Sequence, residues 1–334
     1  MTVLAMEGFE HGNISSVDQS VSLSDTNIST SYGRFGGNGL ILGGGNDVCS
    51  VNITPNTYST IYVGFALKCV GWTIGDNWYN SNFINLQSGG YTICGLAVPV
   101  DYYIGLFLKT GTGTFSGSII DTNFIANIGK WDFYEISAVI HATAGSIVLK
   151  RNGEIITNLT GLDTDFGYSY FDTFMIRYAN NSFYIDDIYI TDDGFLGDVR
   201  IRGFVPDSNG STNNFTPSAG SNYQCVDETP DTDDTDYVSS NSPGDIDLYG
   251  ITTGALADVK GIQVRNSTRK DDAGTREVRA IVRSNGSNYN GDTVEPIDSY
   301  SGVCKQIWET DPDDSNAWTQ TKLEAAEFGL EIVT

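Results

Sequence analysis

Hydrophobic and polar residues alternate along much of the first half of the chain. Successive side chains of a β-strand point to opposite faces, so an alternating run predicts a strand with one buried face. Gly, Asn, Asp or Ser separates these runs, as expected for short strands joined by turns. Many such strands at close spacing favour a sandwich or jelly roll. The clearest alternating runs are residues 59–69, 102–110, 132–142, 145–159, 171–179 and 182–191.

The strongest local prediction is a β-hairpin over residues 147–158. Its centre is an Asn-Gly pair, and these residue types accept the positive φ angles that a two-residue type I′ turn requires. Such a turn fixes the register of both strands. The predicted cross-strand pairs are Arg151 with Glu154, exposed and charged, and Leu149 with Ile156, packed.

Two acidic pairs lie in the stretch NSFYIDDIYITDDGF at residues 181–195. Regular alternation places Asp186 and Asp187 on opposite faces. Carboxylates that diverge cannot act together as acid and base unless a neighbouring strand supplies the missing partner. We therefore expect the final strand of a first domain, with both carboxylates hydrogen-bonded to loop backbone. The expected faces are Phe183, Ile185, Asp187 and Tyr189 on one side, and Tyr184, Asp186, Ile188 and Ile190 on the other.

The pattern changes in the second half of the chain. Residues 207–246 are rich in Ser, Asn, Thr, Asp and Pro, which predicts a long loop or a decorated sheet edge. Strands are expected again within residues 259–267 and 275–284. Near the end, Thr319 precedes a run of good helix formers, and Gly329 is where that helix is expected to stop before a last strand.

Length and composition support two β domains. A chain of 334 residues exceeds the usual size of one domain. Glycine (38), tyrosine (18) and phenylalanine (16) are plentiful and methionine (3) is rare, as expected for strands and turns. We expect one domain over residues 1–195 and another over residues 196–334.

The formal net charge of -24 comes from 42 acidic and 18 basic residues. Nucleic acid is disfavoured as a partner because phosphate contacts need clustered Lys and Arg. An anionic membrane surface is disfavoured for the same reason. Charge of this size also keeps copies of a protein apart, so assembly requires specific contacts.

The N-terminal stretch shows no basic start followed by an apolar core, so no secretory signal is expected. The longest apolar run, residues 61–67, is too short to span a bilayer, and synthesis in the cytosol is the expectation. The cysteines are widely spaced and odd in number, which disfavours a disulfide framework or a zinc site and predicts buried thiols. They are Cys49, Cys69, Cys94, Cys225 and Cys304.

Several motifs resemble one protein family. They are AMEGFEHG (5–12), GRFGGNGLIL (33–42), WDFYEISAVI (131–140), GSIVLKRNGEII (145–156) and FYIDDIYITDDG (183–194). In this order they look like the concanavalin A-like lectin/glucanase jelly roll found in virion proteins of tailed bacteriophages. The later motifs are similar to the C-terminal module that follows this jelly roll: GDVRIRGFVPD (197–207), DTDYV (234–238), IQVRNSTRKDDAGTREVRAIVRSNG (262–286) and DPDDSNAWTQTKLEAAEFGLEI (311–332).

The resemblance covers nearly the whole chain. It implies an all-β protein, with a concanavalin A-like jelly roll at residues 1–195 and a second β-sandwich with a short C-terminal helix at residues 196–334. It also implies a virion protein made in the host cytoplasm, with other virion proteins as partners. Homo-oligomers, trimers among them, are common in spikes and fibres of this kind. A position on the tail or on the capsid surface stays open.

An enzymatic role is not expected. Glucanases of this fold carry E-x-D-x-x-E on one strand, whereas residues 131–140 contain Glu135 alone. The histidines are His11 and His141 only, and no G-x-S-x-G context surrounds a serine or cysteine nucleophile. A glucanase-type glycoside hydrolase is the least favoured alternative.

The segment ETPDTDDTDY at residues 228–237 is a candidate calcium loop. Hard cations need several converging carboxylate oxygens, but the segment lacks the glycine turn and distal glutamate of an EF-hand. A solvated acidic loop is therefore the preferred interpretation, and no cofactor is expected. The candidate ligands are Asp231, Asp233, Asp234 and Asp236.

Exposed aromatic rings beside hydrogen-bonding groups are typical of sugar sites. The best candidate is the segment GWTIGDNWYNSN at residues 71–82, although aromatic residues in β-proteins more often belong to the core. Its candidate glycan-binding residues are Trp72, Asp76, Trp78, Tyr79 and Asn80.

Seven of the 18 Lys and Arg residues lie between Lys260 and Arg283. Regular alternation predicts that Val264, Val278, Ala280 and Val282 line the core and that Arg265, Arg279 and Arg283 line the other face. This positive stripe is a candidate docking surface for an acidic patch of a neighbouring subunit. Neutralisation by Glu277 and nearby aspartates is the equal alternative.

These observations favour a non-enzymatic phage virion structural protein, either tail-associated or a capsid decoration, that acts by docking onto other proteins, with adhesion to a host surface glycan left open. The alternative function is a carbohydrate-binding receptor-recognition module.

Overall fold

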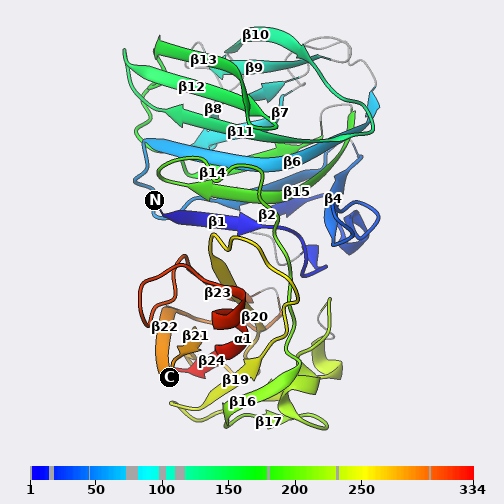
Figure 1. The fold of residues 1–334 in the computed structure, drawn as a ribbon, viewed down its shortest axis with the longest axis vertical. Helices are drawn as coiled ribbons and strands as arrows, with labels where there is room; N and C mark the ends of the chain where they lie inside the picture. Colours follow the sequence, from blue (N-terminus) through cyan, green and yellow to red (C-terminus); the bar gives the residue numbers. More distant parts are fainter. Residues whose placement is uncertain are drawn as a thin grey trace. The chain divides into compact units, whose positions relative to one another are not determined.

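The structure is a computed structural model that describes residues 2–14, 19–44, 46–72, 82–97, 103–109, 117–178, 181–230, 233–300 and 302–334. These residues form β-strands and one short α-helix, which confirms the predicted all-β class. The chain divides into two compact units, Met1–Arg202 and Gly203–Thr334 (Figure 1). Residues 196–202, which the predicted division assigns to the second domain, pack with the first unit.

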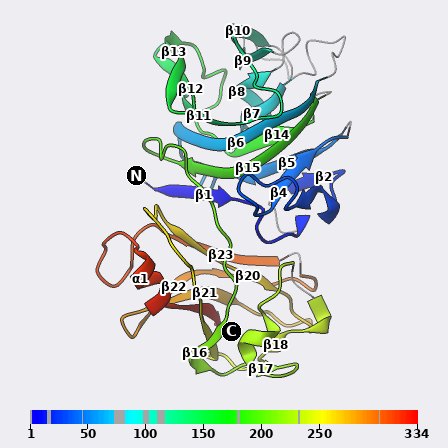
Figure 2. The ribbon, with the colours of Figure 1, turned by 45° about the vertical axis from the view of Figure 1, so that its right-hand side comes forward.

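Two antiparallel sheets form the two layers of the first unit (Figures 1 and 2). Within the described residues, the eight-stranded sheet has the order β13-β12-β11-β6-β15-β4-β3, with β1 also paired to β15, and the seven-stranded sheet has the order β10-β9-β8-β7-β14-β5-β2. The strands of the first sheet are β1 (Val3–Glu7), β3 (Ile28–Ser29), β4 (Gly39–Leu42), β6 (Thr60–Trp72), β11 (Trp131–Val139), β12 (Gly145–Arg151), β13 (Glu154–Leu162) and β15 (Asn181–Thr191). Those of the second are β2 (Gln19–Val21), β5 (Val48–Asn52), β7 (Asn82–Ser88), β8 (Tyr91–Ala97), β9 (Tyr103–Lys109), β10 (Gly117–Ile125) and β14 (Thr173–Arg177).

The inner faces of the two sheets share one hydrophobic core. Phe83 of β7 stacks on Phe183 of β15 with ring centroids 4.6 Å apart, and Phe65 of β6 lies 5.6 Å from Phe174 of β14. Both pairs join one sheet to the other. Full burial of one such side chain stabilises the fold by roughly 1.5–3 kcal/mol, so alternation along the strands is what holds the sandwich together. All five cysteines are buried, as predicted.

The predicted hairpin within residues 147–158 has the expected turn but a different register. Both residues of its Asn-Gly turn have positive φ angles, 51° and 85°, and the charged pair beside the turn forms as predicted. Leu149, however, pairs with Thr157 because a β-bulge adds one residue to the second strand. The predicted pairing of Leu149 with Ile156 is therefore wrong, and Ile156 is 36% exposed.

A second irregularity interrupts β15, where the pairing with β6 shifts between Asp186 and Tyr189. Asp187 has a φ of 55°, in the left-handed region. The shift resets the alternation, so Ile185 before it and Ile188 after it both join the core. The predicted placement of these two isoleucines on opposite faces is wrong, because regular alternation does not survive a bulge.

The second unit contains a five-stranded sheet of order β16-β19-β24-β21-β22 and two separate two-stranded ribbons, counted over its described residues. Strands β20, β21 and β23 share a hydrophobic core with helix α1, which gives the predicted second sandwich with its short helix. The sheet strands are β16 (Ser208–Asn213), β19 (Ile246–Gly250), β21 (Val278–Ser284), β22 (Ser287–Val294) and β24 (Glu327–Ile332). The ribbons are β17 (Thr216–Pro217) with β18 (Val238–Ser239), and β20 (Ile262–Thr268) with β23 (Gly302–Trp308). The helices of this unit are α1 (Gln320–Ala325) and the 3₁₀ turns η4 (Asn222–Cys225) and η5 (Asp233–Thr235), whereas the 3₁₀ turn η2 (Asp25–Asn27) belongs to the first unit.

Helix α1 begins as predicted and ends earlier. The Thr319 hydroxyl accepts a hydrogen bond from the backbone N–H of Lys322 at 3.3 Å, which caps the first turn. The helix stops before Ala326, and Gly329 lies inside β24. A Cβ at Gly329 would come 1.8 Å from the carbonyl oxygen of Asp247. The predicted helix end at Gly329 is wrong, because this glycine permits close approach of two strands.

Gly95 of β8 provides a test of the packing in the seven-stranded sheet. An added Cβ would lie 1.9 Å from the carbonyl oxygen of Ile84 on β7. We expect Gly95→Ala to lower the free energy of unfolding by about 1–3 kcal/mol, the usual cost of overpacking, in urea titrations. Gly43→Ala is the matched control, because its Cβ would meet no atom nearer than 3.8 Å. Equal losses in the two variants would contradict this account.

Candidate functional site

The shift in β15 brings two carboxylates to one arginine-containing turn. Asp186 Oδ2 accepts a hydrogen bond from the backbone N–H of Arg34 at 2.8 Å, and Asp187 Oδ2 lies 3.5 Å from Nη1 of the Arg34 guanidinium. Both aspartates are buried, at 3% and 1% exposed. The prediction that these carboxylates diverge is therefore wrong. The predicted hydrogen bonds to loop backbone are confirmed.

Arg34 belongs to a glycine-rich turn between β3 and β4 in which positions 33 and 37 leave no room for a side chain. A Cβ at Gly33 would lie 1.9 Å from the carbonyl oxygen of Gly37, and a Cβ at Gly37 would lie 2.1 Å from Oε1 of Glu10. Glu10 Oε2 also accepts a hydrogen bond from the backbone N–H of Asn38 at 3.0 Å. The turn is thus folded closely onto acidic side chains, which satisfy N–H groups that no sheet reaches.

Residues 196–202 are fixed by the same kind of contact. Asp187 Oδ1 accepts a hydrogen bond from the backbone N–H of Ile201 at 2.7 Å. Glu135 of β11, 2% exposed, accepts one from the backbone N–H of Gly197 at 2.9 Å. Charge-assisted hydrogen bonds of this type are stronger than those between neutral groups. Two buried carboxylates therefore hold the segment that follows the first sandwich.

Tyr189 of β15 completes the contact between this segment and the outer face of the eight-stranded sheet. Its hydroxyl donates to Glu135 Oε1 at 2.5 Å and accepts from the backbone N–H of Leu196 at 3.0 Å. Its ring lies 6.3 Å from that of Phe133, in a cluster against which Leu196 and Val199 pack. Burial and the Glu135 carboxylate raise the pKa of the Tyr189 hydroxyl, so it remains a hydrogen-bond donor.

The Arg34 guanidinium binds the segment from the turn. It donates to both carboxylate oxygens of Asp198, at 2.6 and 2.7 Å. Burial lowers the pKa of Arg34, but Asp198 and then Asp187 outweigh burial and raise it above its usual value. The exposed ring of Phe35 lies 4.7 Å from this guanidinium and 4.8 Å from that of Arg200. Turn and segment are therefore joined by both charge and ring contacts.

Proton binding distinguishes the two central carboxyls from exposed aspartates. Burial, followed by the charge of Asp187, raises the pKa of Asp186 above its usual value, and hydrogen bonds from the N–H groups of Arg34 and Asp187 oppose this only in part. Burial also raises the pKa of Asp187, against the lowering by the Ile201 N–H and Arg34. Groups this close titrate as a pair. The pair therefore keeps a proton at a pH where exposed aspartates are ionised.

The geometry of this cluster suits fixation of polypeptide. Catalytic carboxylates of a glycosidase must face a substrate bond, about 5–10 Å apart across space for the sugar or a water. The named oxygens of Glu135, Asp186 and Asp187 instead meet backbone N–H groups or Arg34. What the arrangement does chemically is neutralise one arginine and satisfy backbone donors of two loops.

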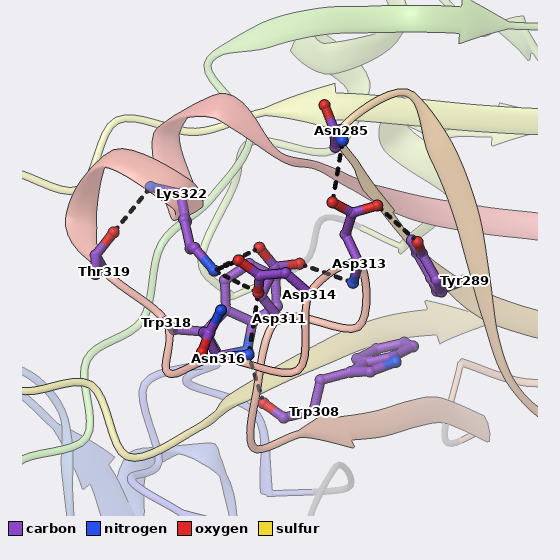
Figure 3. Close-up of polar contacts among 10 residues, drawn as sticks. All are labelled: Asn285, Tyr289, Trp308, Asp311, Asp313, Asp314, Asn316, Trp318, Thr319 and Lys322. Atoms are coloured by element: carbon purple, nitrogen blue, oxygen red, sulfur yellow. Dashed lines mark hydrogen bonds and ion pairs between the residues drawn. The ribbon is translucent and has the colours of Figure 1, made fainter.

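A second charged cluster lies in the second unit and contains its own cation (Figure 3). Lys322 of α1 extends its ammonium to the loop before the helix, where Nζ lies 2.6 and 2.7 Å from the two oxygens of Asp314. Asp311, 3% exposed, lies 3.1 Å from the same nitrogen. The Trp318 indole N–H donates to the carbonyl oxygen of Trp308 at 3.0 Å and closes the loop.

Asp313, between these aspartates in sequence, points away from Lys322 (Figure 3). Its oxygens accept hydrogen bonds from Asn285 Nδ2 and the Tyr289 hydroxyl, both at 3.0 Å. The hydrogen bond from Lys322 lowers the pKa of Asp314 to about 2. The loop thus contains several aspartates, as metal-binding loops do, but its carboxylates Asp311 and Asp314 are paired with the ammonium of Lys322.

A row of side chains crosses the outer face of the seven-stranded sheet. Asn85 lies between the core residues Ile84 and Leu86, so alternation turns its side chain away from the core. The cross-strand register continues the row on both sides of Asn85. Its members, in order, are Ser50, Met175, Asn85, Gly95 and Phe107.

Amide and hydroxyl groups on this face form a connected network. Gln87 Nε2 donates to the hydroxyl of Thr92 at 3.4 Å, and that hydroxyl donates to Asn85 Oδ1 at 3.0 Å. Asn85 is 2% exposed, and its Nδ2 has no hydrogen-bond acceptor within the described residues. Gly95 adds no side chain between Asn85 and Phe107 in the row. A buried donor without an acceptor is rare and calls for an explanation.

Lys109, at the end of β9, is the other buried nitrogen of interest. Its side chain is 2% exposed, and no hydrogen-bond acceptor for Nζ lies in the described part of the chain. The ammonium lies 4.5 and 4.6 Å from the ring centroids of Tyr91 and Tyr168. Burial lowers the pKa of Lys109. Cation–π contacts with both rings compensate part of its lost hydration.

Most of the predicted glycan loop lies outside the described residues. This holds for Asp76, Trp78, Tyr79 and Asn80, and Trp72 is described only as the last residue of β6. The candidate calcium ligand Asp231 also lies outside them, and Asp233 is described only as part of η5. Both sites stay predictions.

The remaining calcium candidates have protein partners. Asp236 Oδ1 accepts a hydrogen bond from the Ser218 hydroxyl at 2.9 Å, and Asp234 pairs with Arg269 at 2.5 Å. Within the described ranges, no group of three or more His, Cys, Asp or Glu side chains is arranged to hold a metal ion. Those ranges also contain no helix able to cross a membrane.

The arginine stripe has the expected faces and unexpected partners. Val264, Val278, Ala280 and Val282 all lie in the core of the second unit, as predicted. Arg279 Nε lies 2.7 Å from Glu331 Oε2 and Arg283 Nε lies 3.8 Å from Glu327 Oε2. Both glutamates lie on β24, the strand that pairs with β21. The alternative predicted from the sequence instead names Glu277 and nearby aspartates as the neutralising groups. A docking role for Arg265, Arg279 and Arg283 stays a hypothesis.

The polar row and the Lys322 cluster were not predicted from the sequence. Alternation within FINLQS does place Asn85 and Gln87 on one face, so a signal for the row was present. The signal for the other cluster was DPDDSN, whose Asp and Asn residues favour turns through hydrogen bonds to their own backbone. Neither signal identifies the strand or helix that supplies the remaining partners.

No family model matches the sequence, and no curated protein matches it. Among solved structures, the chain is similar to an endo-β-1,4-glucuronan lyase from the fungus Trichoderma reesei, at 12% identity and a TM-score of 0.43, covering 57% of this chain and 96% of that one. It is also similar to the catalytic domain of a glycoside hydrolase family 131 protein from Coprinopsis cinerea (10%, TM-score 0.35, 60% and 87%) and to the binding domain of botulinum neurotoxin serotype D (13%, TM-score 0.34, 82% and 89%). Likeness of this size concerns β-sandwich architecture and assigns no activity.

The proton held by the buried pair gives a pH test. Because the folded pKa of Asp186 is raised above the unfolded value near 4, the folded state binds more protons, and the pair's contribution to stability falls as pH rises. The amide that replaces this carboxyl in Asp186→Asn does not titrate, so the variant should not lose stability in this way. The free energy of unfolding of Asp186→Asn minus that of the unchanged protein should therefore increase from about pH 5 to about pH 8 in urea titrations. The exposed control Asp193→Asn should show no such trend. A relative stability of Asp186→Asn that is flat with pH would contradict the assignment.

The Lys322 cluster gives a separate test. Lys322→Met leaves the carboxylate of Asp311 buried without its cation, so amide exchange in residues 309–318 should become roughly tenfold faster. The pKa of Asp314 is lowered in the folded state. The ion pair of Asp314 with Lys322 therefore stabilises the fold above about pH 4, and this stabilisation is lost as the pH falls to about 2. Hydrogen-exchange mass spectrometry measures both effects. Lys260→Met, at an ion pair with 43% and 73% exposed side chains, is the control and should leave exchange unchanged. Loss of protection in both variants, or in neither, would contradict the role given to Lys322.

Proposed function

We propose that this chain is a carbohydrate-binding β-sandwich protein, and that the outer face of its seven-stranded sheet is the glycan-binding surface. The supporting observation is the network of Asn85, Gln87 and Thr92, in which Asn85 Nδ2 has no acceptor among the described residues. Asn85 Nδ2 is itself buried, so a sugar hydroxyl would reach it only after the side chains above it move; Thr92 and Phe107, both partly exposed, are the groups of this face that a sugar meets first.

The proposal assigns binding without turnover. Three buried carboxylates of the first unit, Glu135, Asp186 and Asp187, are committed to backbone donors or to Arg34. A group that satisfies buried N–H groups is costly to withdraw for acid–base chemistry. This use of the carboxylates supports a scaffold that presents a surface, in line with the adhesive role that the phage resemblance implies.

A structural role in a phage particle is the second candidate. The observation that favours it is the fixation of residues 196–202 on the first unit through Asp187, Asp198 and Glu135. A segment held in this way is suited to transmit mechanical force between a phage particle and the surface to which it binds. Glycan adhesion and attachment to a particle are compatible, and we propose the virion as the location of this chain.

A glycan array followed by calorimetric titration of the best oligosaccharide tests the binding proposal. Alginate and β-1,4-glucuronan oligosaccharides belong on the array, together with neutral β-glucans. We expect Asn85→Ala and Gln87→Ala each to weaken binding about tenfold, the effect of one lost hydrogen bond. The control is Asn241→Ala, the same truncation at an exposed residue of the second unit.

Three results would count against the proposal. Absence of binding on the array would remove its basis, and equal binding by Asn85→Ala and the unchanged protein would remove the surface. Cleavage of any oligosaccharide that disappears in the Asp186→Asn/Asp187→Asn double variant would replace binding by catalysis.

A further inference from the structure

Strand β13 is an uncovered edge of the eight-stranded sheet. It pairs with β12 on one side and, among the described strands, with nothing on the other. β13 spans nine residues, Glu154–Leu162, whereas β3 at the other end of the sheet spans two. A long free edge leaves N–H and C=O groups directed at solvent, and proteins usually blunt it with lysine, proline or a bulge.

The composition of β13 does little to blunt this edge. Its sequence, EIITNLTGL, contains no lysine, arginine or proline, and Glu154 at its start is its one charged residue. The register with β12 shifts once near each end of the strand, at Ile156 and at Gly161, and between these shifts Thr157–Thr160 pairs with β12 regularly. On a chain with a net charge of -24, this uncharged stretch is where like-charge repulsion between copies is weakest.

Exposed isoleucines gather beside the same edge. Ile155 and Ile156 of β13 are 59% and 36% exposed. Ile125 and Ile128, 56% and 42% exposed, belong to the segment that the Arg151 side chain contacts through the carbonyl oxygen of Ile125 at 2.7 Å. Ile155 and Ile156 thus lie on this edge, and Ile125 lies beside Arg151, which pairs with Glu154 at the start of β13.

We propose that β13 pairs antiparallel with β13 of a second copy of this chain, about a two-fold axis at Asn158. Opposite residues of an antiparallel pair share a face, so this register sets Asn158 against itself and Thr157 against Leu159 of the partner. An asparagine amide carries a donor and an acceptor, so two of them satisfy each other across the axis. The two eight-stranded sheets then continue into one another.

The isoleucines lie beyond the regular stretch. Ile156 is the extra residue of the first shift, and the Ile155 end of one strand lies opposite the Gly161 end of the other, where the absence of a side chain leaves room. The pairing is isologous, so it produces a dimer and no larger ring. It involves the eight-stranded sheet, and therefore does not depend on the glycan surface proposed for the other sheet.

Cysteine cross-linking of the full chain tests the register. Cα atoms of facing residues lie about 4.5–5.5 Å apart, within the span of a disulfide. We expect Asn158→Cys to give a covalent dimer under mild oxidation, with little background because all five native cysteines are buried. Asn241→Cys, at an exposed residue of the second unit, is the control and should cross-link at least tenfold more slowly.

Sedimentation equilibrium tests the dimer without a new cysteine. The unchanged protein should have twice its chain mass of 36.2 kDa at micromolar concentration. Asn158→Lys places like charges across the axis and should give the monomer mass, while Asn158→Ser should retain the dimer. Circular dichroism confirms that each variant is folded. A monomer mass for the unchanged protein, or equal cross-linking of the two cysteine variants, would overturn the proposal.

Discussion

The bulge in β15 is the constraint on which the first unit depends. Regular alternation would carry Asp186 and Asp187 to opposite faces of the sheet, and one of them would enter the core. The shift instead keeps Ile185 and Ile188 in the core and both carboxylates within reach of Arg34. From that position Asp186 holds the glycine-rich turn, and Asp187 holds the segment that leaves the sandwich.

The same use of acidic side chains recurs throughout this acidic chain. Asp47 Oδ2 accepts hydrogen bonds from the backbone N–H groups of Gly43 and Gly44, at 2.9 and 2.7 Å. In the second unit, Asp247 accepts from the Tyr249 hydroxyl at 2.6 Å and from Asn222 Nδ2 at 2.8 Å. Irregular backbone carries N–H groups that no sheet satisfies, and a buried carboxylate can satisfy several of them at once. Much of the negative charge thus serves the loops of a β-protein.

The two sheets of the first unit are suited to different contacts. The outer face of the seven-stranded sheet carries the hydrogen-bonded amide and hydroxyl groups of Asn85, Gln87 and Thr92, on which the proposed glycan site rests. Residues 196–202 cover part of the outer face of the eight-stranded sheet, around Phe133 and Tyr189, and the edge of that sheet at β13 pairs with no other described strand. A sandwich that binds a glycan on one sheet and a second copy through the other would present two glycan surfaces at once, which raises avidity without new contacts.

The sequence alone determined the all-β class, the Asn-Gly turn, the Thr319 cap and the core face of the strands near Val264 and Val282, because these follow from residue types within a few positions of one another. It also predicted that Asp186 and Asp187 hold loop backbone. Only the tertiary structure decided where alternation breaks, since a bulge depends on the strand that pairs alongside. It also decided which distant groups meet, such as Arg34 with Asp198 and Arg279 with Glu331, because long-range ion pairs leave no periodic trace in a single chain.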